Sequence, residues 1–179
     1  MIEKSDKFIV LDLDETLIHA TQIELDTPFN FKVDRFFIYE RPYLRDFLID
    51  ISKHFSIGIW SSATDSYVNE IVEQIKPDSV NFEIVWGRSK CSLKRDTTFD
   101  TYCFEKRLEK LKKKGFKLEQ ILVADDSPSK ARTNYGNAVC MREFLGDLND
   151  CELKFLYEYL LTFKTVDNVR TIEKRGWRR

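Results

Sequence analysis

Short continuous apolar runs alternate along this chain with segments whose apolar residues recur at helical spacing. The runs have the length and the β-branched content of buried strands, and they cover residues 7–13, 55–60, 121–124 and 138–140. The helical spacing predicts helices that start at Pro42 and that cover residues 64–75, 104–114 and 149–163. Alternating strands and helices predict an α/β fold built on a doubly wound parallel sheet.

Residues 77–103 break this alternation. They contain an apolar stretch at residues 82–86 and then polar, irregular sequence, which we interpret as a small β insertion. The gaps after the first two predicted strands are too short for a large cap domain. A chain of 179 residues has the usual size of one domain, so we predict a single domain over residues 1–179.

Charge and cysteine content narrow the class of protein. The 29 Lys and Arg residues nearly balance the 30 Asp and Glu residues, so the composition does not indicate a nucleic-acid partner. The four cysteines lack a C-x-x-C spacing, which favours free thiols over a zinc site. No apolar run could span a bilayer, and the first residues lack the apolar stretch of a signal peptide. We therefore expect no membrane partner and a cytoplasmic location, or a nuclear one in a eukaryote.

Acidic and hydroxyl side chains follow the predicted strands, at the ends where parallel sheets bind ligands. Asp12 and Asp14 follow the first strand, Ser61 and Ser62 the second, and Asp125 and Asp126 the third. Carboxylates this close repel each other unless a cation is shared, and hard oxygen ligands favour Mg²⁺. A lone D-x-D is usually a solvated turn, but a second acidic pair after another buried strand favours a metal site.

These residues belong to motifs that resemble those of a known family. The run DLDETLIH at residues 12–19 resembles the DxDx[TV] signature of haloacid dehalogenase superfamily phosphatases. In its longer form it is similar to the FCP/SCP branch, the NLI-interacting-factor-like or RNA polymerase C-terminal-domain phosphatases. Further matches in the same order are ERP at residues 40–42, WSSA at 60–63 and VADDSP at 123–128. The resemblance implies a Rossmann-like, HAD-like sheet over nearly the whole chain.

The resemblance also implies roles for the acidic residues. Asp12 would attack phosphorus and form an aspartyl-phosphate. Asp14 would protonate the leaving oxygen, would then activate water, and would bind Mg²⁺ through its backbone carbonyl. Asp12 and Asp126 would ligate the metal directly, with Asp125 beside them.

Other polar residues would bind the phosphate and the substrate. By the same resemblance, Ser61 and the Ser62 amide would contact the transferring oxygens. One lysine would complete the neutralisation of charge. We favour Lys106, which we expect to open a helix, over Lys94 in the insertion. Arg88, also in the insertion, is a candidate substrate contact, and a surface arginine is the alternative reading.

Together these features predict a Mg²⁺-dependent phosphomonoester hydrolase that acts on phosphoserine or phosphothreonine in a protein or peptide. The alternatives are a phosphatase of small molecules or nucleic-acid ends on the same fold, or a scaffold without catalysis. A dehalogenase needs no metal, so the presence of acidic residues suited to a metal site argues against that activity. We further expect an aromatic flap with Phe36, Phe37 and Tyr39, and a frayed tail at residues 174–179. The sequence does not indicate an oligomeric state.

Overall fold

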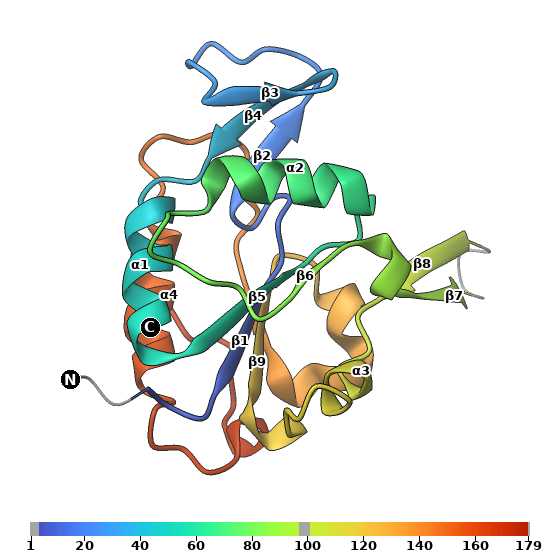
Figure 1. The fold of residues 1–179 in the computed structure, drawn as a ribbon, viewed down its shortest axis with the longest axis vertical. Helices are drawn as coiled ribbons and strands as arrows, with labels where there is room; N and C mark the ends of the chain where they lie inside the picture. The colour runs from blue at the N-terminus through green and yellow to red at the C-terminus, as the bar shows by residue number, and fades with distance from the viewer. Residues whose placement is uncertain (1–3, 97–100, 179) are drawn as a thin grey trace.

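The computed structural model describes residues 4–96 and 101–178 (Figure 1). Within these residues, five parallel strands form the main sheet in the order β10-β9-β1-β5-β6. They are β1 (Phe8–Leu11), β5 (Ser56–Trp60), β6 (Val85–Trp86), β9 (Ile121–Asp125) and β10 (Ala138–Cys140). The order runs outward from β1 in both directions, which confirms the predicted doubly wound sheet.

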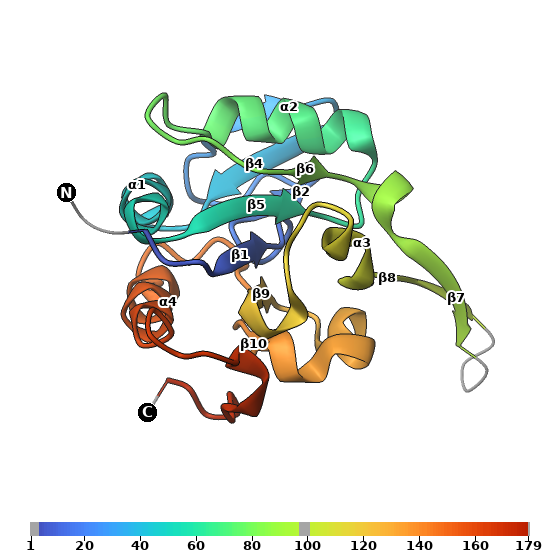
Figure 2. The same ribbon diagram turned by 60° about the horizontal axis from the view of Figure 1, so that its bottom comes forward.

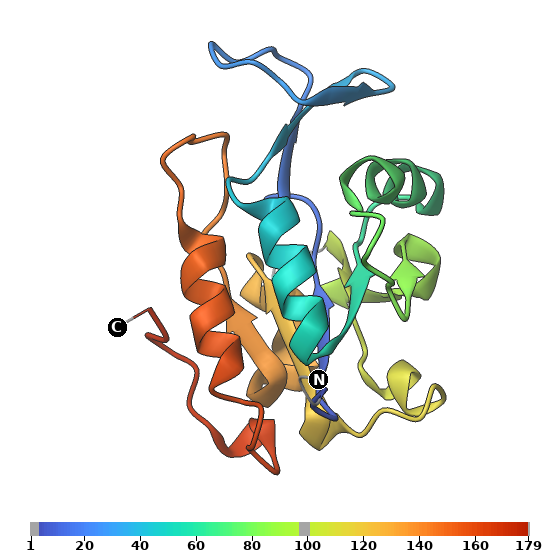
Figure 3. The same ribbon diagram turned by 60° about the vertical axis from the view of Figure 1, so that its left-hand side comes forward.

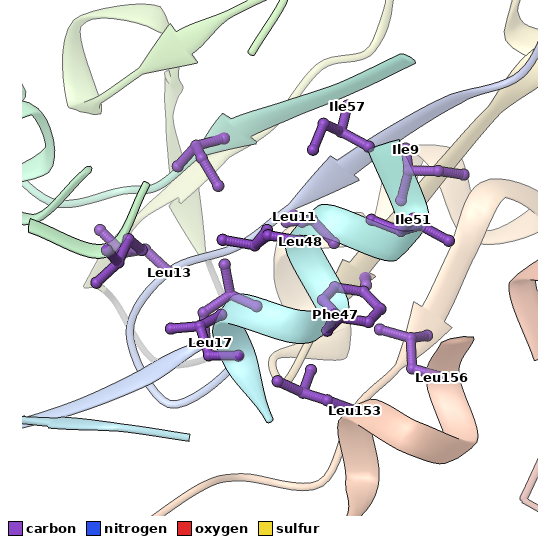
Figure 4. Packing of buried hydrophobic residues seen from close by; sticks show 14 of the residues in the cluster. Ile9, Leu11, Leu13, Leu17, Phe47, Leu48, Ile51, Ile57, Leu153 and Leu156 are labelled. Atoms are coloured by element: carbon purple, nitrogen blue, oxygen red, sulfur yellow. The ribbon is translucent and has the colours of Figure 1, made fainter. Parts of the chain in front are cut away.

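The sheet is covered on both faces because alternate residues of β1 point in opposite directions. Ile9 and Leu11 pack against α1 (Leu44–His54), α2 (Asp65–Ile75) and α4 (Glu152–Leu161), as Figure 4 shows for α1 and α4. Figure 3 shows α1 and α4 side by side. Phe8 and Val10 pack on the other face, against α3 (Glu109–Lys112). Each fully buried Leu or Ile stabilises the fold by about 1.5–3 kcal/mol.

An antiparallel flap follows the first strand. Among the described residues its order is β2-β4-β3, with β2 (Ile18–Thr21), β3 (Phe31–Val33) and β4 (Phe36–Glu40). It lies beyond the carboxyl end of β1 (Figures 1 and 3). Of the expected flap aromatics, Tyr39 is buried, whereas Phe36 and Phe37 are partly exposed.

The predicted helix at residues 104–114 is wrong over its first half. The described residues form a second antiparallel pair, β7 (Ser92–Asp96) with β8 (Thr101–Glu105), and α3 begins only at Glu109. Cross-strand pairing of Phe104 with Leu93 decides the conformation, because β8 finds a partner that helical spacing does not reveal. The insertion is also shorter than the expected residues 77–103, because the stretch at residues 82–86 ends in β6, which belongs to the main sheet. Residues 97–100 of that insertion lie outside the described residues.

Smaller expectations were corrected as well. Helix α1 begins at Leu44 rather than Pro42, because Tyr43 has a left-handed backbone with φ of 67°. The expected frayed tail is not found at residues 174–178, and Arg179 lies outside the described residues. Lys174 is buried and donates to the carbonyls of Gly136, Val169 and Ile172.

Three short 3₁₀ turns are η1 (Arg88–Lys90), η2 (Leu118–Gln120) and η4 (Val169–Thr171). A longer 3₁₀ segment, η3 (Pro128–Asn137), is interrupted at Asn134. Helices long and apolar enough to cross a membrane are absent from the part of the chain that is described.

Candidate active site

Three turns meet at the carboxyl edge of the main sheet because β5, β1 and β9 are neighbours. Asp12 follows β1, and its amide donates to the Ala124 carbonyl of β9 at 2.9 Å. Ser61 follows β5, and its amide donates to the Trp86 carbonyl of β6, also at 2.9 Å. These bonds continue the sheet pairing past the strand ends, so the side chains that follow are held by the sheet.

Lys106 lies between two carboxylates at this edge. Its Nζ is 2.6 Å from Asp12 Oδ1 and 2.6 Å from Asp125 Oδ2. All three side chains are at most 3% exposed. Removing charges from water is costly, and a buried ion pair offsets that cost only when its geometry is good. Lys106 follows β8 and does not open a helix, which corrects the expected local structure. Lys94 lies elsewhere, half exposed and 3.0 Å from Glu105.

The carboxylates at this edge fit a divalent metal. Ligand oxygens of Asp12, Asp125 and Asp126 all lie within 4.8 Å of one another. Among the described residues, the Lys106 ammonium lies beside Asp12 in this group of three carboxylates, and a divalent cation would add positive charge to it. Oxygen donors of this kind suit Mg²⁺. The cluster therefore matches a magnesium site in both its charge and its ligand type.

Asp14 has different surroundings from Asp12, although only one residue lies between them in the sequence. Its carboxylate accepts a hydrogen bond from Tyr67 Oη at 2.7 Å and from Ser61 Oγ at 3.3 Å. Its carboxylate does not join the metal cluster of the described residues. The chain turns immediately afterwards, where Glu15 has a φ of 57°.

Tyr67 was missed by the sequence reasoning. Burial raises the pKa of its hydroxyl well above the usual value, and the charge of Asp14 raises it further. Tyr67 therefore stays protonated and donates to Asp14. The available signal was its position in the first turn of α2, a helix that begins at the same sheet edge as Ser61. The apolar periodicity of α2 concealed that signal.

Arg41 is a second residue whose place the sequence did not indicate. Its guanidinium is 1% exposed, donates to both Asp150 oxygens at 2.9 and 2.8 Å, and donates to the Thr16 carbonyl at 2.9 Å. Burial opposes ionisation of Asp150, but its hydrogen bonds with Arg41 prevail and lower the pKa of Asp150. Thr16 Oγ1 in turn accepts from the Asp126 amide at 3.1 Å. Arg41 thus braces the turn that carries Asp12 and connects it to the Asp126 turn.

The remaining predicted site residues lie beside Asp14. Ser61 is buried, and its Oγ accepts from the Ala63 amide at 3.0 Å. Ser62 is partly exposed, and its carbonyl accepts from Arg88 Nε at 2.8 Å. Arg88 and Asp14 both line a cleft of about 660 Å³ between the flap and α2. The structure therefore brings together every predicted site residue at one sheet edge, with Arg88 at the cleft.

The chain is similar to proteins of a known family. The chain matches the family "NLI interacting factor-like phosphatase" over residues 7–170. It is 29% identical over 169 residues to CTD small phosphatase-like protein 2 of Dictyostelium discoideum, covering 90% of this chain and 28% of that protein. It is 24% identical over 183 residues to human carboxy-terminal domain RNA polymerase II polypeptide A small phosphatase 1, covering 95% of this chain and 64% of that protein.

The fold is similar to that of a variant of the fission yeast RNA polymerase II CTD phosphatase Fcp1 bound to beryllium fluoride. The TM-score is 0.57 at 19% identity, covering 91% of this chain and 52% of that one. The chain thus spans less than two thirds of each of these proteins. Because the family match covers almost the whole chain and includes all three turns of the site, this chain belongs to the NLI interacting factor-like phosphatase family, the FCP1-like branch of the haloacid dehalogenase superfamily.

Proposed function

We propose that this chain is a Mg²⁺-dependent phosphatase that hydrolyses phosphoserine and phosphothreonine in proteins through a phospho-aspartate on Asp12. The observation that supports this most is the different surroundings of Asp12 and Asp14. Asp12 is paired with the Lys106 ammonium beside two further acids, whereas Asp14 is held by two hydroxyl groups. Two acids on one turn with different partners suit the separate roles of nucleophile and general acid.

In the first step an Asp12 oxygen attacks phosphorus, and the bond from phosphorus to the substrate oxygen breaks. Asp14, in its acid form, gives its proton to that oxygen, so serine or threonine leaves as the neutral alcohol. Lys106 holds the Asp12 carboxylate through Oδ1 and so orients it for the attack. Tyr67 holds Asp14 Oδ1, which fixes the plane of the carboxyl group.

In the second step Asp14, now a carboxylate, takes a proton from water while the water oxygen attacks phosphorus. The bond between phosphorus and Asp12 breaks, which releases inorganic phosphate and restores the Asp12 carboxylate. With substrate bound, the Ser61 hydroxyl turns its one hydrogen from Asp14 to the transferring oxygens, which the Ser62 amide also binds, while Tyr67 still holds Asp14. Positioning and electrostatics supply most of the catalysis of phosphoryl transfer, so rigid donors at a sheet edge are suitable.

Asp12 and Asp126 would hold Mg²⁺, with Asp125 beside them and with the Asp14 carbonyl implied by the family resemblance. Asp125 is already engaged by Lys106 and by the Ser127 amide at 2.8 Å. When bound, Mg²⁺ supplies positive charge that offsets the repulsion between the Asp12 carboxylate and the phosphate dianion.

Removal of the metal tests this chemistry. We expect chelation by EDTA to lower the rate of para-nitrophenyl phosphate hydrolysis by about 100-fold or more, because the acidic cluster then repels the phosphate. Excess Mg²⁺ should restore the rate. Circular dichroism should show that the chelated protein is still folded. Full activity of the metal-free protein would contradict the proposal.

A substrate panel tests the proposed substrate class. The panel contains phosphoserine, phosphothreonine and phosphotyrosine peptides, sugar phosphates and a 5′-phosphorylated oligonucleotide. We expect kcat/KM for the phosphoserine or phosphothreonine peptides to be at least about tenfold higher than for the other substrates of the panel, because an open cleft admits an extended chain. A preference for the sugar phosphates or the oligonucleotide would replace the substrate class and leave the chemistry intact.

Tyr67→Phe tests the assignment of Asp14 as the general acid. Loss of the hydroxyl leaves Asp14 less well oriented, so kcat for a phosphoserine peptide should fall by about tenfold. Hydrolysis of para-nitrophenyl phosphate should change by less than about threefold, because its leaving group departs without a proton. An equal loss on both substrates would indicate a merely structural role for Tyr67.

A further inference from the structure

The β7–β8 hairpin projects from the body of the molecule beyond the carboxyl end of β6 (Figures 1 and 2). Its register gives it two different faces, because directly opposed residues lie on the same side of an antiparallel pair. The pairs Leu93 with Phe104 and Arg95 with Tyr102 form one face, which we call the aromatic face. Lys94, Cys103 and Glu105 lie on the opposite face.

The apolar side chains of the aromatic face are unusually exposed to solvent. Leu93 is 60% exposed and Tyr102 is 63% exposed, while Phe104 between them is partly buried. On the opposite face, the buried Glu105 pairs with Lys94 at 3.0 Å. Single exposed apolar residues are ordinary, but adjacent ones on a projecting element indicate an interaction surface.

Arg88 connects the aromatic face to the candidate active site. Its guanidinium lies 5.0 Å from the centre of the Phe104 ring, and its Nε donates to the Ser62 carbonyl. The same side chain lines the cleft that contains Asp14 and Tyr67. A continuous surface therefore leads from Ser62 through Arg88 to Phe104 and then to Leu93 and Tyr102.

The chemistry of this surface selects its occupant. It combines one aliphatic and two aromatic side chains with the guanidinium group of Arg88. An extended polypeptide with apolar and acidic side chains complements both properties. We propose that the aromatic face binds the segment of a substrate protein that flanks its phosphorylated residue. This inference rests on the proposed protein phosphatase function and adds a docking surface to it.

Docking here predicts a specific kinetic effect. Leu93 and Tyr102 are not among the residues assigned to the reacting phosphorus, so their contacts with a substrate should be the same in the ground state and in the transition state. Such contacts lower KM and leave kcat unchanged. Only substrates long enough to reach the hairpin should benefit, at about 3.3 Å of chain per residue.

The test uses the double variant Leu93→Ser/Tyr102→Ser, whose side chains are exposed, so the fold should be retained. The matched control is Ser92→Ala/Cys103→Ser on the opposite face. Each protein is assayed with para-nitrophenyl phosphate, with a blocked phosphoserine tripeptide, and with a peptide of about 15 residues. In the long peptide, leucine and glutamate residues lie on both sides of the phosphoserine.

We expect the aromatic-face variant to raise KM for the long peptide by about tenfold, with kcat changed by less than about twofold. The tripeptide, para-nitrophenyl phosphate and the control variant should show native values. An unchanged KM for the long peptide would refute docking on this face while leaving the phosphatase proposal in place. Native hydrolysis of para-nitrophenyl phosphate without hydrolysis of either peptide would instead remove the protein substrate class, and docking with it.

Self-association is the competing use of this face, and light scattering measures it in the same samples. A native dimer that the aromatic-face variant converts to a monomer, with an unchanged KM for the long peptide, would assign the face to a second copy of the chain. That result would also overturn the inference.

Discussion

Replacement of Asp12 by Asn is expected to reduce kcat for para-nitrophenyl phosphate by about 10⁴-fold or more. An amide oxygen is a far weaker nucleophile than a carboxylate, and no other described carboxylate has the same partners. Asp125 shares Lys106 with Asp12 but also accepts from Ser127, and Asp14 is held by Tyr67 and Ser61. Loss of Asp12 therefore leaves the site without an equivalent group.

The Asp12→Asn variant should remain folded, because Asn has the same shape and its oxygen still accepts from Lys106. Thermal unfolding monitored by circular dichroism checks this. The control is Asp78→Asn, at an exposed position, which should keep native activity. Rapid quenching of the native enzyme should give a phosphorylated peptide containing Asp12, identified by mass spectrometry. More than about 1% residual activity in a folded, metal-loaded Asp12→Asn protein would refute the nucleophile assignment.

Replacement of Lys106 by Met is expected to lower kcat by about 10³-fold, because it removes the cation that neutralises the site. The ammonium lies 2.6 Å from each of Asp12 and Asp125, both buried. Without it the two buried carboxylates lose the ammonium that lies between them. Breaking a buried ion pair by removing one partner typically lowers the free energy of unfolding by about 3–5 kcal/mol. Mg²⁺ should therefore raise the melting temperature of the variant more than that of the native protein.

Lys94→Met is the matched control for Lys106→Met. Lys94 is the same residue type in the same region of the chain, but its side chain is 46% exposed and pairs with Glu105 on the hairpin. Because Lys94 pairs with Glu105 rather than with the carboxylates of the site, kcat should stay within about twofold of the native value. Glu105 is buried, so thermal unfolding is measured alongside to separate a loss of stability from a loss of activity. If both lysine variants lose activity equally, or if Lys106→Met retains native kcat, then Lys106 is not the neutralising group.

Local sequence was sufficient for the framework of the site. β1, β5 and β9 are continuous apolar runs because strands buried on both faces need apolar residues at every position. Parallel strands present their carboxyl ends at one edge, so the acids after β1 and β9 could be expected to meet. The predicted helix at residues 104–114 was wrong because its first residues pair with Leu93 and its neighbours. Such pairing depends on a second segment, so the apolar pattern of one segment does not reveal it.

The sequence by itself therefore determined the doubly wound sheet and the residue types at its active edge, because burial and periodicity act over a few neighbouring residues. The tertiary structure alone decided which partner each group has. It placed Lys106 rather than Lys94 between the acids, directed Asp14 toward Tyr67, and braced the first turn with Arg41. Residues as far as 109 positions apart, such as Arg41 and Asp150, take part in this bracing, and the geometry of packed elements determines such contacts.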